Sequence, residues 1–387
     1  MKAVVLGNGR SGKAAAELLR TEGAYVVVLD GNDPWPGGTW DMCVTSPGIP
    51  LDHPWQVAAR ASGTKVISEL QLGAYRWKGQ ALAITGSKGK SSVVKLIADT
   101  LNLAGIHATP CGNYGTPLCE VVLRAAGRPS HGEWAVVEVS SFQMETTEEF
   151  HPDAAAVLNL QEDHIDRHGS VEVYHALKMK LLAGARRAFC CGVGPGDADP
   201  ALLRGSYFDN RILRGNGLIA IALMRTAGLD DDQIAAGFRA FEPLPHRMQL
   251  VLERDGVRYV DDSKATSVAA LAAGVEMCGG PVRLIAGGLA KGDDPGLAIP
   301  NLRSAVRKAY LIGDCAERFQ AAWQEYVPCE TCKTMDRAVA AAARDASAGE
   351  TVLLSPGTAS FDQFSSYGER GDTFAALVRT APGDKIT

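Results

Sequence analysis

Residues 80–105, QALAITGSKGKSSVVKLIADTLNLAG, constrain the fold more than any other part of the chain. This segment opens with a continuous apolar run, continues through glycines, serines and lysines, and ends in a helical pattern closed by glycine. A buried strand, a glycine-rich turn and a helix in this order are typical of a phosphate-binding unit in an α/β sheet. The segment therefore predicts an α/β domain built around a phosphate site.

The spacing within this turn differs from the common phosphate loop, whose pattern is G-x-x-x-x-G-K-[ST]. Here only Ser87 and Lys88 separate Gly86 from Gly89. The required groups are still present, because backbone N–H groups can face an anion, Lys90 adds a charge and Ser91 offers a hydroxyl to magnesium. The alternative is a glycine- and serine-rich helix start beside a solvated lysine. The strand, turn and helix favour the phosphate site.

Length and charge narrow the class of protein. A chain of 387 residues exceeds what one core usually supports, so we expect two or three domains. A net charge of -5 argues against nucleic acid or an anionic membrane as the main partner. The sequence shows neither a membrane-spanning apolar run nor a signal peptide, and its nine cysteines suit reduced thiols. We expect a cytoplasmic monomer that acts on small molecules.

Apolar runs alternate with helical patterns along the whole chain, which predicts three consecutive α/β domains. The first two apolar runs, 2–6 and 25–30, lie on either side of a helical segment, which predicts a βαβ unit. A parallel crossover followed by a strand needs more chain than the short stretch 31–45, so we expect the first domain to be small. The prolines of EPLPHRM, at 242–248, predict a hinge. The expected domains are 1–78, 79–243 and 244–387.

A second glycine turn, GNGRSG, occupies residues 7–12. It follows an apolar run and precedes a helical pattern, and Asp30 ends the next run, where dinucleotide enzymes place a carboxylate on a ribose hydroxyl. Taken alone, this arrangement favours an NAD-dependent oxidoreductase. Any nucleotide diphosphate can rest on such a turn, however, and a tight turn without a ligand is a further alternative.

Glu138 lies toward the carboxyl end of the apolar run 133–141, and His164 follows the next run, 153–160. The carboxyl ends of parallel strands share one edge, so both side chains are expected near the phosphate loop, within reach of a metal bound beside ATP. Lys178 and Lys180 lie on the next helical segment. Residues two apart on a helix face opposite ways, so at most one of these lysines points inward.

The third domain carries polar residues after its apolar runs. His246 and Arg247 follow the hinge, and Asp261 and Asp262 end the run 258–262. Because adjacent strand residues face opposite sides, only one of the two aspartates is expected to act. Further polar positions predict a pocket for a small carboxylate, namely Lys264, Lys291 and Ser360.

Taken together, these motifs resemble the Mur ligases, ATP-dependent amide ligases of peptidoglycan precursor synthesis. The resemblance runs nearly end to end, and its motifs appear in the order of the family. They are SPGIP, AITGSKGKSS, CGNYGTP, VEVSSFQME, LNLQEDHIDRHG, YHALK, LPHR, DDSKATS and LSPGTASFDQF.

The resemblance implies a small Rossmann-like UDP-binding domain, a central P-loop ATPase domain with a mainly parallel sheet, and a C-terminal Rossmann-like domain that binds an amino acid. It implies ATP binding by Gly86, Ser87, Lys88, Gly89, Lys90, Ser91, Ser92, Asn216, His246, Arg247 and Asp262. UDP-substrate binding is implied for Gly9, Arg10, Ser11, Asp30, Gly48 and Asn113. The amino acid would be surrounded by Lys264, Thr266, Lys291, Ser360 and Tyr367. Magnesium, expected as two ions, would be held by Ser91, Glu138, His164 and a carbamylated Lys178.

The implied reaction joins D-glutamate to UDP-N-acetylmuramoyl-L-alanine through an acyl phosphate, with Lys90, His164 and Lys178 as catalytic residues. Phosphoryl transfer needs mainly positioning and charge neutralisation, and domain closure protects the acyl phosphate from water. Three alternatives stay open: a Mur-like ligase that adds L-glutamate or another amino acid, a UDP-sugar-binding relative without activity, and the oxidoreductase.

The chain also departs from the family pattern. Lys88 replaces the usual asparagine of the loop, Ile212-Leu213 stand where the family has a His-Asn pair, and Tyr367 replaces a common phenylalanine. The segments after Asp30 and between Lys178 and Asn216 are short. These departures affect the expected adenine, uridine and glutamate contacts.

Overall fold

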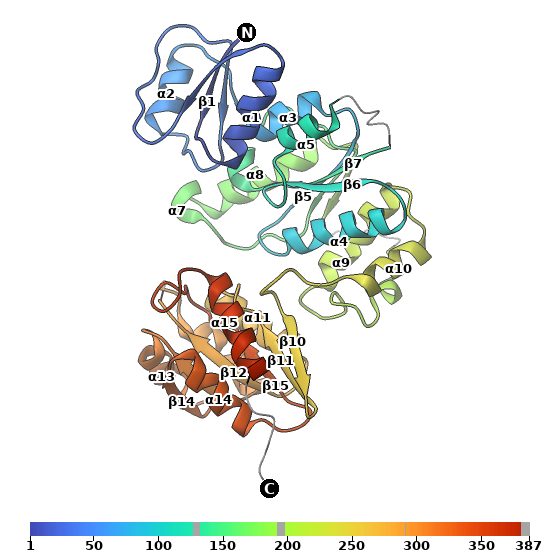
Figure 1. Ribbon diagram of the computed structural model, residues 1–387. Helices are drawn as coiled ribbons and strands as arrows, with labels where there is room; N and C mark the ends of the chain where they lie inside the picture. Colours follow the sequence, from blue (N-terminus) through green and yellow to red (C-terminus); the bar gives the residue numbers. More distant parts are fainter. Residues whose placement is uncertain (127–131, 192–197, 291, 381–387) are drawn as a thin grey trace. The chain divides into compact units, whose positions relative to one another are not determined.

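The computed structural model describes residues 1–126, 132–191, 198–290 and 292–380. The chain divides into two compact units, one formed by Met1–Asp209 and Leu213–Phe241, the other by Asn210–Ile212 and Glu242–Thr387. The first unit contains two sheets and the second contains one (Figure 1).

The amino-terminal sheet is four-stranded and parallel, with the strand order β2-β1-β3-β4. Successive residues of β1 point to opposite faces, so Ala3 and Val5 pack against α1 while Val4 and Leu6 pack against α2. The elements are β1 (Lys2–Leu6), α1 (Arg10–Thr21), β2 (Tyr25–Leu29), β3 (Met42–Thr45), α2 (Pro54–Ala61), β4 (Val66–Ser68) and α3 (Glu69–Arg76).

One expectation about this sheet is wrong. The stretch after Asp30 does support a parallel crossover, because β3 pairs in parallel with β1. The crossover is a loop without a helix, and its side chains Trp35 and Trp40 pack on the cluster around Val4 and Leu6. Two large aromatic rings thus cover apolar surface that a helix would otherwise cover.

The second sheet of this unit is five-stranded and parallel, with the order β6-β7-β5-β8-β9. Because β5 lies between β7 and β8, the loops that follow these three strands meet at one edge. The elements are β5 (Gln80–Thr85), α4 (Lys90–Leu103), β6 (Ala108–Gly112), α5 (Leu118–Ala125), β7 (Trp134–Glu138), α6 (Ser141–Met144), β8 (Ala154–Val157), α7 (Ile165–His168), α8 (Val171–Ala183), β9 (Arg187–Cys190), the 3-10 helix η1 (Pro200–Leu203), α9 (Arg214–Thr226) and α10 (Asp231–Ala240).

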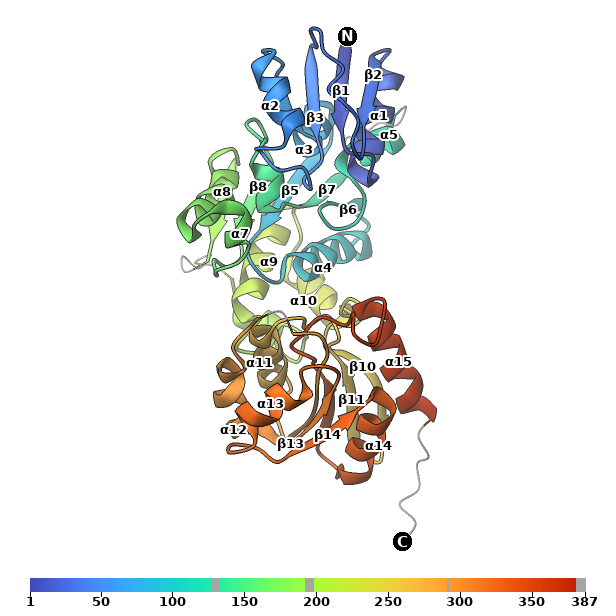
Figure 2. The same cartoon turned by 90° about the vertical axis from the view of Figure 1, so that its left-hand side faces the viewer.

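The second unit holds a six-stranded sheet of order β10-β11-β15-β12-β13-β14, in which the β10–β11 pair is antiparallel and the other pairs are parallel. Figure 2 shows α11 and α12 on one side of this sheet and α14 and α15 on the other. Apolar clusters on both faces show that helices cover the sheet from two sides. The elements are β10 (Gln249–Arg254), β11 (Val257–Asp261), α11 (Val268–Met277), β12 (Val282–Gly287), the 3-10 helix η2 (Pro295–Ala298), α12 (Ile299–Ala305), β13 (Val306–Ile312), α13 (Ala316–Trp323), β14 (Cys329–Lys333), α14 (Met335–Asp345), β15 (Thr351–Leu354) and α15 (Tyr367–Thr380).

The predicted α/β class and the mainly parallel sheets are confirmed by these three sheets. The domain boundaries at 78/79 and 243/244 stay predictions. All nine cysteines are free. In the part of the chain that the structure describes, no helix combines the length and the apolar character needed to span a membrane.

Candidate functional site at the phosphate loop

The predicted phosphate loop connects the end of β5 to the first residue of α4. Gly86 and Gly89 both have positive φ, 145° and 84°. A Cβ atom on Gly89 would lie 2.3 Å from Nδ2 of Asn216, so no other residue fits without displacing that amide. The first N–H groups of α4 follow this turn directly, which is where a phosphate site requires them.

Asn159, just after β8, fixes the loop through its side-chain amide. Its Oδ1 accepts from the Lys88 N–H at 2.8 Å, and its Nδ2 donates to the Lys88 carbonyl at 2.8 Å. The same Nδ2 donates to Oδ1 of Asn216 at 3.2 Å. Asn159 was not among the predicted site residues, although its place as the first polar residue after a buried strand was the available signal.

Ser87 anchors the loop from its other side. Its buried Oγ donates to the Gln161 carbonyl and accepts from the Gln161 N–H, both at 2.9 Å. The hydroxyl of Tyr174 on α8 donates to the same Oγ at 3.2 Å. The loop is therefore held by residues that follow β8 and by α8 before any ligand binds.

Two lysines converge on the Gly86 carbonyl. Lys90 Nζ donates to it at 2.9 Å and Lys178 Nζ at 3.0 Å. Lys178 is 1% exposed and lies 4.4 Å from the centre of the Tyr174 ring. Burial, and next the charge of Lys90, lower the pKa of Lys178 to about 7. Lys180 points the other way and pairs with Glu148, so the expectation that only one of the two lysines is inward is confirmed.

Lys88 is exposed and forms an ion pair with Asp163, with Nζ and Oδ2 3.0 Å apart. Burial raises the pKa of Asp163, but the hydrogen bond from Lys88, its charge and the neighbouring His164 together hold that pKa below its ordinary value. The second cation of the loop is therefore directed to a carboxylate and does not crowd Lys90. Asp163 is another residue that the sequence did not reveal.

Ser91 and Ser92 occupy the first turn of α4, where Ser92 is buried and Ser91 is half-buried. Glu138, the last residue of β7, is 2% exposed. Its Oε1 accepts from Asn113 Nδ2 at 2.7 Å, while its buried Oε2 has no hydrogen-bond partner among the described residues. An unpaired buried carboxylate oxygen is costly unless a cation meets it, so Glu138 suits a metal ligand.

His164 directly precedes α7 as its N-cap residue in the left-handed conformation, and it is exposed, with its ring 4.9 Å from that of Phe142. Within the described residues, no three His, Cys, Asp or Glu side chains gather into a metal cluster. Ser91 and Glu138 lie at the loop edge and offer oxygen atoms, which are the ligands that magnesium prefers. The residues present fit such an ion.

Of the residues predicted for UDP, Asn113 follows β6 in the five-stranded sheet, and the others lie at the carboxyl end of the amino-terminal sheet. Gly9, Arg10 and Ser11 follow β1, and Asp30 follows β2. Gly48 follows β3 in the SPGIP segment. The parallel order β2-β1-β3 brings these other residues to one edge.

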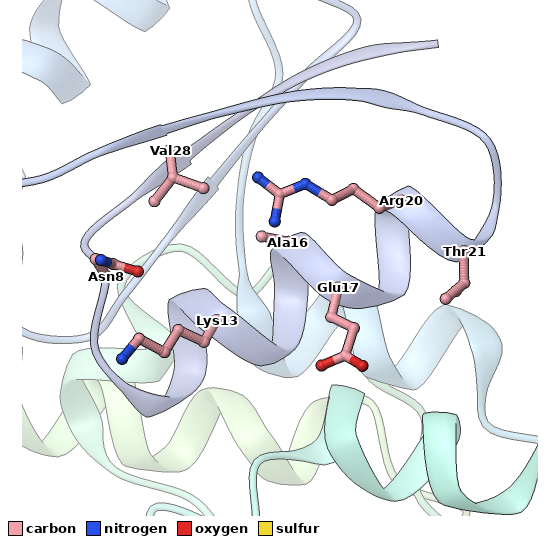
Figure 3. Close-up of a pocket in the computed structure, with 7 residues that line it drawn as sticks. All are labelled: Asn8, Lys13, Ala16, Glu17, Arg20, Thr21 and Val28. Atoms are coloured by element: carbon pink, nitrogen blue, oxygen red, sulfur yellow. The ribbon is translucent and has the colours of Figure 1, made fainter.

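Two grooves flank α1 beside this edge. One, of about 530 Å³, runs along the helix from the glycine turn and is drawn in Figure 3. Its lining residues are Asn8, Lys13, Ala16, Glu17, Arg20, Thr21 and Val28. The other, of about 490 Å³, lies between α1 and α5. Sequence reasoning did not single out either groove.

In the second unit, His246 and Arg247 follow the predicted hinge. His246 has a positive φ of 59°, and its Nδ1 lies 2.7 Å from Oδ2 of the buried Asp261. Arg247 is half-buried. Their assignment to ATP stays a prediction.

Asp262 is buried as well, but it takes different partners from Asp261. It accepts from Ser355 Oγ at 2.9 Å and from the Met248 N–H at 3.3 Å. Burial raises the pKa of Asp262 to about 7. Both aspartates therefore form side-chain contacts, Asp261 with His246 and Asp262 with Ser355.

The residues predicted to surround the amino acid belong to this unit, and their binding role stays a prediction. Lys264 Nζ lies 3.7 Å from the centre of the Tyr367 ring, at the start of α15. Thr266 is half-buried and Ser360 is buried. Lys291 lies outside the described residues.

Arg370 was missed by sequence reasoning. It is fully buried, and its guanidinium donates to the carbonyls of Ser263, Thr358 and Ala359. Burial lowers its pKa to about 10. Arg370 thereby ties the segment containing Lys264 to the segment containing Ser360. No periodicity or spacing distinguishes such an arginine from a surface one.

Comparisons with known proteins agree with this geometry. The Mur ligase middle domain matches residues 84–193, and the Mur ligase glutamate ligase domain matches residues 246–357. The UDP-N-acetylmuramoylalanine--D-glutamate ligase of Nitratidesulfovibrio vulgaris is 35% identical to this chain, over 98% of the chain and 96% of the relative. The chain belongs to the Mur ligase family. The resemblance read from the motifs is thus confirmed.

Further relatives of this Mur ligase carry the same name. Those of Frankia casuarinae and Acidobacterium capsulatum are 37% and 34% identical, covering 98% and 97% of this chain and 94% and 96% of the relatives. Among solved structures, MurF ligase of Thermotoga maritima in complex with ADP has a TM-score of 0.59 at 14% identity, over 97% of this chain and 93% of that one. UDP-N-acetylmuramate-alanine ligase MurC of the same organism has a TM-score of 0.58 at 14% identity, over 98% and 99%. These two similarities support the Mur ligase fold.

Proposed function

We propose that this Mur ligase catalyses ATP-dependent addition of D-glutamate to UDP-N-acetylmuramoyl-L-alanine in cytoplasmic peptidoglycan precursor synthesis, acting as a monomer. Its relatives at 32% to 37% identity bear the name of this activity. The geometric observation that carries the proposal is the convergence of Lys90 and Lys178 on the Gly86 carbonyl, at the edge where Glu138 keeps a buried oxygen unpaired.

In this mechanism the phosphate loop cradles the nucleotide. The N–H groups at the start of α4 and the charge of Lys90 face the phosphates, and Lys90 exchanges the Gly86 and Ser87 carbonyls for phosphate oxygens. Ser91, Glu138, His164 and a carbamate on Lys178 would hold magnesium, which neutralises charge on the transferred phosphoryl group.

The carbamate on Lys178 is supported by the state of its amine. A neutral amine attacks CO₂, forms an N–C bond and releases one proton. With a pKa of about 7, Lys178 is substantially neutral at neutral pH, unlike an ordinary lysine. The carbamate would convert this amine into an anion, which attracts Lys90 and would supply oxygen donors to magnesium.

The acyl step follows from the phosphoryl step. The terminal carboxylate of the UDP-substrate attacks the γ-phosphorus, ADP leaves, and an acyl phosphate forms. The amine of glutamate then attacks the carbonyl carbon, loses a proton, and phosphate departs. Lys264, Thr266, Ser360, Tyr367 and Lys291 are proposed to surround the glutamate, while Asn216, His246, Arg247 and Asp262 border ATP.

A phosphate-release assay tests the proposal. Purified protein is incubated with ATP, magnesium, UDP-N-acetylmuramoyl-L-alanine and one of D-glutamate, L-glutamate, lysine or diaminopimelate. We expect release with D-glutamate alone, and its loss in Lys90→Ala but not in the matched control Lys95→Ala, whose lysine pairs with Asp99 further along α4. Release only with another amino acid would redirect the specificity, and no release with any amino acid would refute the ligase function.

A further inference from the structure

The loop Gly112–Thr116, which runs from the last residue of β6 toward α5, is fixed by close backbone contacts. Gly112 and Gly115 have positive φ of 89° and 84°, and Cβ atoms there would lie 2.3 Å and 2.4 Å from the carbonyls of Glu138 and Pro110. The Gly112 N–H donates to the Thr116 carbonyl at 2.9 Å and closes the loop. Because backbone atoms pack closely at both glycines, a shift of one end of this loop is passed on to the other end.

One end of this loop fixes the carboxylate of Glu138. The Asn113 side chain donates to Oε1 at 2.7 Å, and the Asn113 N–H donates to the Glu138 carbonyl at 2.9 Å. The side-chain bond sets the rotation of the carboxylate and leaves Oε2, which has no partner in the described parts of the chain, as the oxygen available to a cation. Partners of this kind orient metal ligands and raise the affinity for the metal.

The other end of the loop meets the glycine turn of the amino-terminal sheet. Arg10, the first residue of α1, donates from its guanidinium to the Gly115 carbonyl at 2.9 Å. The two residues are separated by 105 positions in the sequence. A continuous set of contacts therefore runs from the turn predicted to bind UDP, through Gly115 and Asn113, to Glu138.

We propose that Asn113 is a positioning residue that orients Glu138 toward a divalent cation, and that Arg10 supports this orientation from the glycine turn through the loop Gly112–Thr116. The proposal rests on the proposed function, because it presumes that a metal–nucleotide complex binds at the phosphate loop. It assigns Asn113 a task distinct from contact with the UDP-substrate.

The test measures Mn²⁺ binding to the full chain saturated with ADP, by calorimetry and by the electron paramagnetic resonance signal of free Mn²⁺, with no UDP-substrate present. In Asn113→Ala we expect Mn²⁺ affinity to fall about 10- to 100-fold, the usual effect of removing a residue that orients a metal ligand. ADP affinity without metal should stay at the wild-type level. Asn113→Leu, which keeps the shape of the side chain, should behave in the same way, and thermal unfolding reports whether each variant is folded.

The link to Arg10 is tested by a double-mutant cycle. Arg10→Ala should also weaken Mn²⁺ binding, and the Arg10→Ala, Asn113→Ala double variant should be no weaker than Asn113→Ala alone, because both act through one loop. Lys13→Ala, one helical turn further along α1, serves as the matched control and should bind Mn²⁺ like the wild type.

The outcomes separate this proposal from the ligase function. Wild-type Mn²⁺ affinity in folded Asn113→Ala, with a raised KM for the UDP-substrate, would make Asn113 a substrate contact only and overturn the positioning role. Independent, multiplicative losses for Arg10 and Asn113 would overturn the link between them. A wild-type chain that binds Mn²⁺ and ADP but releases no phosphate would refute the ligase function while the Asn113 comparison still decides the positioning role.

Discussion

Replacing Lys88 by asparagine removes the ion pair with Asp163 while retaining a polar residue in the phosphate loop. The two side chains are 55% and 29% exposed, and such solvated pairs contribute about 0.2–1 kcal/mol. Converted at about 1.4 kcal/mol per tenfold change, this predicts that the dissociation constant of an ATP analogue rises only about 1.4- to 5-fold. The kcat should stay nearly unchanged, because Lys90 and Lys178 keep their places.

The assay is calorimetric titration of the wild type, Lys88→Asn, Asp163→Asn and the double variant with a non-hydrolysable ATP analogue, at low and at high salt. If Lys88 acts only through its ion pair with Asp163, the double variant should bind the ATP analogue with the same affinity as either single variant, and high salt should remove the difference in affinity from the wild type. If Lys88→Asn weakens binding of the ATP analogue a hundredfold or more, or weakens it equally when Asp163 is also replaced, this reasoning is refuted and Lys88 is a direct phosphate ligand.

Three further predictions concern single residues. Lys178→Ala should lose phosphate release and regain part of it when short carboxylates are added. In the wild type, the incorporation of isotope-labelled CO₂ should increase as pH rises through about 7. Full activity in the alanine variant would contradict the role of Lys178 as a carbamylated metal ligand. Gly89→Ala, strained at a φ of 84° and displacing Asn216, should weaken ADP binding by about tenfold or more in equilibrium dialysis, an expectation that wild-type affinity would contradict. The pKa of Asp262 in the folded state is about 7, above its ordinary value. Between these two pKa values the folded state binds more protons than the unfolded state, so the free energy of unfolding falls as pH rises. Asp262→Asn should flatten this fall in denaturant unfolding measured at several pH values, and an unchanged slope would contradict the prediction.

Much of the fold was predictable because its sheets are mostly parallel and buried. Apolar runs such as β5 and β7 ended at the glycines and carboxylates that the structure places at one edge, so Gly86 and Glu138 were found from pattern alone. Helical spacing also separated Lys178 from Lys180 correctly. These inferences rest on local periodicity, which the sequence displays directly.

The missed features depend on contacts between distant residues. The Lys88–Asp163 pair joins residues 75 apart, and the Asn159 bonds to Lys88 join residues 71 apart. A polar side chain shows no sign of such a partner in its own neighbourhood. The prediction about the crossover to β3 failed for a different reason. The crossover is a loop that covers the sheet with aromatic side chains such as Trp35, so it shows no helical periodicity in the sequence.

The amide of Asn159 carries a consequence for the lifetime of the enzyme. Its Nδ2 donates to the Lys88 carbonyl and to Asn216, so hydrolysis of this amide to a carboxylate exchanges a donor for an acceptor at both contacts. The change adds a negative charge beside the turn that must receive phosphates, where like charges repel. Deamidation of Asn159 would therefore weaken nucleotide binding at this turn, a form of chemical ageing that a loss of ADP affinity would reveal.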